Sequence, residues 1–132
     1  MKSMKRIGVI MVLLLLAANV VYAKGYEVQK KAGEYDVLAV IDRNPPVTGD
    51  NNISIRIKDA SGYIVKDAQV KVEYSMPAMP GMPPMNYKAD AVQKGDEYQA
   101  TMGISMAGSW NIAVKITRAG KTATMKFTLD AK

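Results

Sequence analysis

The stretch NISIRIKD, residues 52–59, decides the fold class because its side chains alternate between apolar and polar. Isoleucine occupies every second position, and serine, arginine and lysine stand between. Successive side chains of an extended strand point to opposite faces, so the pattern predicts a strand with one face in a core and one in water. The same period recurs later in the chain, in DAQVKVEY (67–74) and WNIAVKIT (110–117).

Turn residues separate such runs at short intervals, and no segment in this part of the sequence has a convincing helical period. Short turns between short alternating runs are typical of an all-β fold, and we predict an immunoglobulin-like antiparallel β-sandwich over residues 34–132. Residues 24–33 are expected to be a flexible N-terminal segment. The sandwich is predicted to contain about seven strands, at residues 34–42, 52–59, 67–74, 86–93, 97–106, 110–117 and 122–130.

The aromatic residues are expected either in the core of the sandwich or at its edges. Trp110 begins an inward-facing strand and is expected to fill the core, as tryptophan does in many sandwiches. The chain has seven tyrosines, which we expect at core edges with their hydroxyls reaching water.

The N-terminus has the layout of a secretory signal peptide over residues 1–23. Three basic residues precede an apolar run that extends to Val21, and cleavage is expected after Ala23. The apolar run is shorter than the roughly 20 residues that a spanning helix prefers. We therefore predict a periplasmic or exported protein, with an uncleaved helix anchored in the inner membrane as the alternative.

Composition excludes several function classes. Residues 24–132 carry 15 basic and 12 acidic residues, a net charge of +3, which does not indicate nucleic-acid binding. The chain has no cysteine and no histidine, so it lacks a thiol nucleophile, an imidazole base and Cys- or His-based zinc ligands. No nucleophile elbow or phosphate loop is present either, and we expect a protein that is not an enzyme.

The segment MPAMPGMPPM, residues 76–85, places methionine at every third position among prolines. Proline favours the polyproline II helix, which has three residues per turn and rises roughly 3.1 Å per residue, so neighbouring methionines on a straight rod would begin roughly 9 Å apart. That spacing is too wide for several sulfurs to share one ion. A metal site therefore requires a bend, for which Gly81 is the best candidate, or sulfurs from Met102 and Met106.

Thioether sulfur is a soft, neutral ligand that suits Cu(I) and not Zn(II), Ca(II) or Mg(II). The candidate metal ligands are Met76, Met79, Met82, Met85, Met102 and Met106. Two other interpretations stay open. In one, the loop caps the core and methionine fills irregular gaps; in the other, the loop offers an apolar surface to a protein partner.

Three stretches of the chain resemble the YtkA-like/FixH-like family of small exported or membrane-tethered domains. They are GYIVKDAQVKVEYSMPAMPGMPPM (62–85), GDEYQATMGISMAGSWNIAVKI (95–116) and TMKFTLD (124–130). The resemblance implies an immunoglobulin-like sandwich with a role in copper handling, cation efflux or terminal-oxidase assembly. Family members often carry histidine among the methionines, and its absence here favours Cu(I) over Cu(II).

The sequence thus predicts an exported domain that captures Cu(I) through a methionine-rich loop and transfers it. The expected partner is a membrane metal-efflux or oxidase-assembly protein, with contact to the membrane itself only if the signal is uncleaved. The alternative is a structural or protein-interaction module that uses the same loop as an apolar docking surface and binds no metal.

Overall fold

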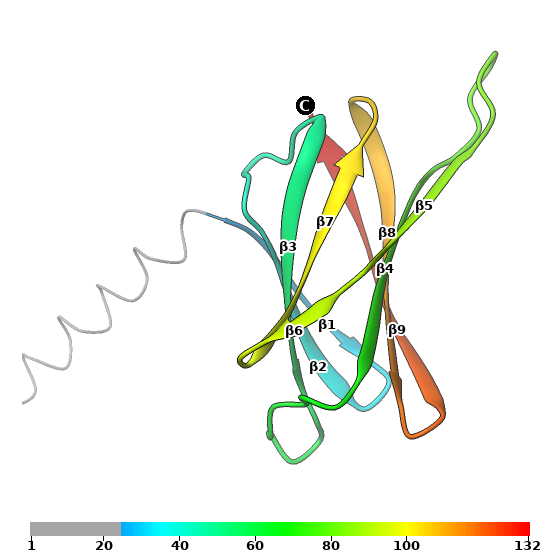
Figure 1. Cartoon of the computed structure of the whole chain (residues 1–132). Helices are drawn as coiled ribbons and strands as arrows, with labels where there is room; N and C mark the ends of the chain where they lie inside the picture. Colours follow the sequence, from blue (N-terminus) through cyan, green and yellow to red (C-terminus); the bar gives the residue numbers. More distant parts are fainter. Residues whose placement is uncertain (1–24) are drawn as a thin grey trace, which may run out of the picture.

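The computed structural model describes residues 25–132, which form two antiparallel β-sheets packed face to face (Figure 1). The predicted signal peptide and its alternative, a membrane anchor, lie outside these residues. Among the described residues, no helix is long and apolar enough to cross a membrane. The strands are β1 (Tyr26–Ala32), β2 (Tyr35–Ile41), β3 (Gly49–Lys58), β4 (Gln69–Met76), β5 (Met85–Asp90), β6 (Val92–Lys94), β7 (Glu97–Ile104), β8 (Gly108–Arg118) and β9 (Lys121–Ala131).

The two sheets have the strand orders β1-β2-β3-β7-β6 and β5-β4-β8-β9. Every paired neighbour is antiparallel. The predicted all-β class and the two-sheet sandwich are therefore confirmed. The sheets enclose one hydrophobic core between their inner faces.

The strand count differs from the seven predicted, for two reasons. Residues 24–33 were expected to be flexible, yet Tyr26–Ala32 form β1 and pair with β2 along their whole length. The run predicted at 86–93 is divided at Ala91, so that β5 pairs with β4 in one sheet and β6 pairs with β7 in the other. Both extra strands are sheet edges, where few side chains point into the core and the apolar alternation is correspondingly weak.

The alternation in the opening stretch has its expected cause. Ile53, Ile55 and Ile57 are each 0% exposed, and the polar residues between them face outward. Trp110 is also fully buried, as predicted, and its indole Nε1 donates a hydrogen bond of 3.0 Å to the carbonyl oxygen of Met106. The tryptophan thus ties the core to the turn that precedes β8.

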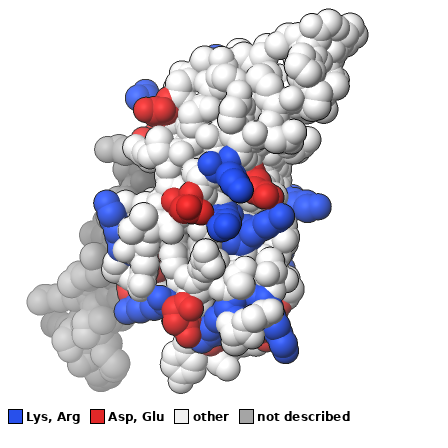
Figure 2. Space-filling model, turned by 45° about the vertical axis from the view of Figure 1, so that its right-hand side comes forward, with Lys and Arg blue, Asp and Glu red and all other residues white. Residues whose placement is uncertain are grey.

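One end of the sandwich carries the methionine segment. The chain leaves β4 after Met76 and returns in β5 at Met85, and this hairpin projects beyond the rest of the molecule (Figure 1). The turn between β7 and β8 lies at the same end, as does the C-terminus. On the face shown in Figure 2, charged side chains lie over the body of the sandwich, whereas the projecting tip is uncharged.

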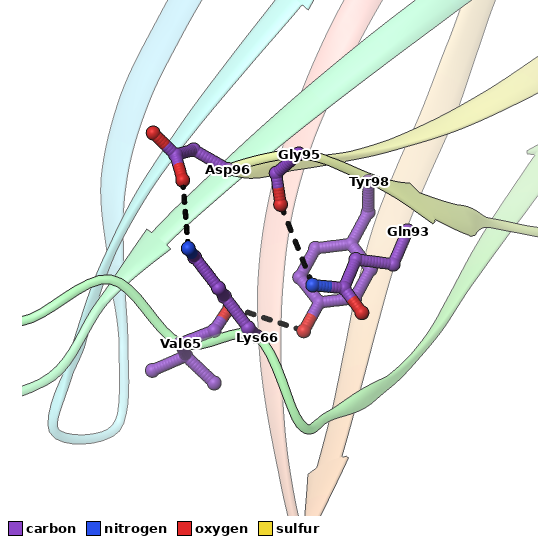
Figure 3. Close-up of polar contacts among 6 residues, drawn as sticks. All are labelled: Val65, Lys66, Gln93, Gly95, Asp96 and Tyr98. Carbon is purple, nitrogen blue, oxygen red and sulfur yellow. Dashed lines mark hydrogen bonds and ion pairs between the residues drawn. The ribbon is translucent and has the colours of Figure 1, made fainter.

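The expectation that tyrosine hydroxyls reach water is wrong for Tyr98. The residue is 2% exposed, and its hydroxyl donates a hydrogen bond of 3.0 Å to the carbonyl oxygen of Val65 (Figure 3). The same hydroxyl accepts one of 3.1 Å from the backbone N–H of Ala68. An ion pair of 3.1 Å between Lys66 and Asp96 lies beside it. Together these contacts fix the connection between β3 and β4 against β7, at the end opposite the methionine hairpin.

Candidate metal-binding site

The methionine segment folds back on itself in a tight turn at Pro80 and Gly81. The backbone N–H of Met82 donates to the carbonyl oxygen of Met79 at 2.8 Å, and the N–H of Met79 donates to the carbonyl of Met82 at 3.1 Å. Gly81 has a φ of 78°. Proline followed by a glycine with positive φ is the signature of a type II turn. The segment is therefore a hairpin and not a straight polyproline II rod, and it bends where a metal site would require.

Because of this turn, the methionines that stand at every third position face each other in cross-strand pairs. Met79 and Met82 form an antiparallel bridge, and Met76 lies opposite Met85 in the register of β4 and β5. Side chains directly opposite each other in an antiparallel pair begin about 5 Å apart at Cβ. The bend thus brings neighbouring methionine side chains within reach of a shared ion, two at a time.

The tip pair is open to solvent. Met79 is 40% exposed and Met82 is 38% exposed. Their neighbours in the turn are proline, alanine and glycine, which offer no competing side-chain ligand. Two soft donors therefore stand side by side at the most prominent point of the hairpin.

The two methionines at the base of the hairpin, Met76 and Met85, pack against the body of the sandwich instead. Met76 is 3% exposed, and a Cβ on Gly108 would lie 3.1 Å from its terminal methyl carbon, so the two residues are in close contact. Met85 is half-buried and its sulfur accepts a hydrogen bond of 3.5 Å from the hydroxyl of Ser105. Through these contacts the base of the hairpin packs against the turn between β7 and β8.

The remaining two predicted ligands differ from each other. Met102 is 0% exposed, lies opposite Asn51 in the pairing of β3 and β7, and belongs to the core. Met106 is half-buried in the turn after β7 and packs against the core. The tip lies three residues beyond the base on each arm, about 10 Å at roughly 3.3 Å per residue. The six methionines accordingly form an exposed pair at the tip, a half-buried group at the base (Met85 and Met106) and two core residues (Met76 and Met102).

Electrostatically the hairpin is neutral. No charged residue occurs from Tyr74 to Tyr87, and the tip is correspondingly white in Figure 2. In the part of the chain that the structure describes, no group of three His, Cys, Asp or Glu side chains is placed to hold a metal ion. A pair of thioethers in neutral surroundings is a donor set that fits Cu(I) and does not fit hard divalent cations.

Sequence reasoning missed the aromatic support of the hairpin. Tyr74 and Tyr87 pair across β4 and β5 and stack with ring centroids 5.5 Å apart, and each lies 6.1 Å from the Trp110 ring. The Tyr74 hydroxyl also accepts a hydrogen bond of 3.2 Å from the backbone N–H of Gly103. A signal existed in the sequence, because the two tyrosines stand at equal distances from the turn.

The fold and the hairpin define a small β-sandwich domain that presents a thioether pair at one end. The chain belongs to the YtkA-like family, whose model matches residues 29–115, and the resemblance seen in the sequence is thereby confirmed. A search of curated proteins gave no match.

Two solved structures share the fold. One is FetP of uropathogenic Escherichia coli strain F11, in its as-isolated form after expression in the periplasm, with a TM-score of 0.53 and 11% identity over 82% of this chain and 96% of FetP. The other is the copper-reconstituted P19 protein of Campylobacter jejuni, with a TM-score of 0.54 and 8% identity over 82% of this chain and 95% of P19. At these identities the likeness shows a common fold and nothing about ligands.

Proposed function

We propose that this protein is an exported, non-enzymatic domain that captures Cu(I) at its methionine hairpin and passes it to a membrane metal-efflux or oxidase-assembly protein. The observation that carries the proposal is the turn at Pro80 and Gly81, which sets the exposed thioethers of Met79 and Met82 side by side. We also propose that the sandwich is immunoglobulin-like, as the sequence pattern predicts.

Three properties of the tip suit it to the capture of Cu(I). Thioethers carry no proton at physiological pH, so Met79 and Met82 are ready to bind without deprotonation. The flexible methionine side chains can close on an ion from Cβ positions about 5 Å apart. The uncharged surroundings neither attract hard cations nor stabilise a doubly charged ion, and this favours Cu(I) over Cu(II).

Release follows from the same geometry. The pair lies at a projecting end and is not enclosed by the body, so a partner's ligands can approach the ion while Met79 and Met82 still hold it. Met85 and Met106, half-buried at the base, are the next candidate ligands, whereas Met76 and Met102 support the fold from within.

Two further observations support the proposal. The N-terminal residues have the pattern of an export signal. The other is that P19, which shares the fold, was solved in a copper-reconstituted form, and that FetP, which also shares it, was expressed in the periplasm.

The exposed apolar tip favours a second candidate function, that of a docking surface for a protein partner. Met79 and Met82 are among the large hydrophobic residues that the described part of the chain exposes, and they lie on a charge-free projection. Such a surface can bind a complementary apolar groove without any metal.

Titration with Cu(I) in the presence of a competing chelator separates the two functions. The double variant Met79→Leu/Met82→Leu keeps the apolar surface and removes both sulfurs, so we expect its Cu(I) affinity to fall about tenfold or more. Met125→Leu, at a fully buried core position, is the matched control and should bind as the unmodified protein does. Equal Cu(I) affinity in the double variant and the unmodified protein would exclude copper capture at the tip and leave the docking surface.

A further inference from the structure

The methionines of the described chain fall into three classes of solvent access. Met76, Met102 and Met125 are at most 3% exposed, Met85 and Met106 are half-buried, and Met79 and Met82 are 40% and 38% exposed. The most accessible methionines are therefore the two that the turn pairs, while the methionines that support the core are shielded.

Access decides which sulfur a two-electron oxidant reaches first. Hydrogen peroxide transfers one oxygen atom to a thioether: its O–O bond breaks, an S–O bond forms, the sulfur loses two electrons, and the other oxygen leaves as water with both hydrogens. The chain has no cysteine to react first, and Trp110 is fully buried. Among these residues the tip pair is thus the first target, and methionine sulfoxide reductases with a dithiol reductant can reverse the reaction.

Oxidation at this position changes the ligand chemistry and spares the fold. A sulfoxide is polar and presents a hard oxygen in place of a soft sulfur, so it no longer suits Cu(I). A polar group on an exposed tip displaces no core packing, whereas the same change at Met76 or Met102 would disrupt the interior. The hairpin therefore separates the residues whose oxidation alters binding from those whose oxidation would unfold the protein.

We propose, building on the proposed copper capture, that Met79 and Met82 are a reversible oxidation site that switches the copper-free hairpin between a form that binds Cu(I) and a form that does not. Two molecules of peroxide convert the two free thioethers to sulfoxides and leave as two molecules of water, and the oxidised hairpin no longer binds Cu(I). Sulfoxide reduction restores the pair.

The test is to treat the copper-free protein with hydrogen peroxide, remove the peroxide, map sulfoxides by peptide mass spectrometry and measure Cu(I) affinity with a competing chelator without oxygen. We expect sulfoxide first at Met79 and Met82, a Cu(I) affinity at least about tenfold lower, and recovery of the affinity after treatment with both classes of methionine sulfoxide reductase. Far-UV circular dichroism should be unchanged by the first two oxidations. Met79→Leu/Met82→Leu should show no further loss of affinity on brief oxidation, and Met125→Leu should respond as the unmodified protein does.

The outcomes distinguish this proposal from the one on which it rests. Sulfoxides confined to the tip with unchanged Cu(I) affinity would overturn the switch and leave copper capture through other ligands. Oxidation of Met102 or Met125 as fast as the tip would overturn it as well. If the untreated protein binds Cu(I) no better than Met79→Leu/Met82→Leu, copper capture at the tip fails and the switch fails with it, even where the order of oxidation holds.

Discussion

Gly81 supplies the positive φ on which the turn at the tip depends. Its φ of 78° lies in the left-handed region, where a Cβ costs an ordinary residue about 1–2 kcal/mol. Nothing lies within 4 Å of the place that a Cβ would occupy, so the effect of a substitution is one of backbone conformation and not of collision.

Gly81→Ala should therefore weaken Cu(I) binding without weakening the fold. The strained turn opens, Met79 and Met82 separate, and the affinity falls roughly tenfold, the equivalent of the local strain. The tip does not contact the core, so the free energy of unfolding in urea should change by less than about 1 kcal/mol. Chelator competition and denaturant titration of the same preparation measure both quantities.

Gly120→Ala is the matched control for this prediction. Gly120 has a φ of 77° and also has nothing within 4 Å of an added Cβ, but it lies in the turn between β8 and β9 at the opposite end of the sandwich. The same strain there should leave Cu(I) affinity unchanged. A loss of affinity in Gly120→Ala as large as in Gly81→Ala would mean that the turn at the tip has no special role.

At the scale of elements, the hairpin is symmetric in sequence about the bond between Pro80 and Gly81. Met79 mirrors Met82, Met76 mirrors Met85, and Tyr74 mirrors Tyr87. A step of three continued through a two-residue turn produces matched pairs, because residues equally far from the turn face each other. The pairing could thus have been predicted from the spacing together with the turn signature, although regularity alone first suggested a polyproline rod.

Other elements show where sequence reasoning succeeds and where it stops. Strands with a buried face were predictable, because burial of Ile53, Ile55 and Ile57 forces a period of two. The change of sheet at Ala91 was not, because Val92, the apolar residue that begins β6, is 61% exposed and gives no sign of which sheet it joins. Burial of Met76 and Met102 follows from the same period, because each lies on the inward parity of its strand, although methionine by itself serves both cores and surfaces.

Pair geometry, and not methionine content, should control copper binding. Inserting one glycine between Gly81 and Met82 keeps every sulfur but moves the second arm by one residue, so that Met79 no longer faces Met82. We expect Cu(I) affinity to drop toward that of Met79→Leu/Met82→Leu. The same insertion between Ala119 and Gly120 is the control for the effect of a longer turn. Undiminished affinity in the tip insertion would show that local sulfur concentration suffices.

On the scale of the whole molecule, charge and the proposed binding function are separated in space. The body carries ion pairs such as Lys115 with Glu73 at 3.0 Å, whereas the span from Tyr74 to Tyr87 is uncharged. The chain has no histidine and no cysteine, the metal ligands that titrate near neutrality. Copper binding at the hairpin is therefore not coupled to protonation of a ligand.

Cu(I) affinity should therefore be flat between about pH 5 and 8.5, a range in which imidazole and thiol ligands gain or lose protons. A histidine site would bind more tightly as the pH rose through about 6.5, and a cysteine site would continue to strengthen toward about 8.5. Thioethers of Met79 and Met82 bind and release the ion without exchanging a proton, and the uncharged tip should make the affinity insensitive to ionic strength as well. Chelator competition at several pH values, corrected for protonation of the chelator, measures this dependence. Affinity that rises steeply with pH would assign binding to a titrating ligand and remove the hairpin from the mechanism.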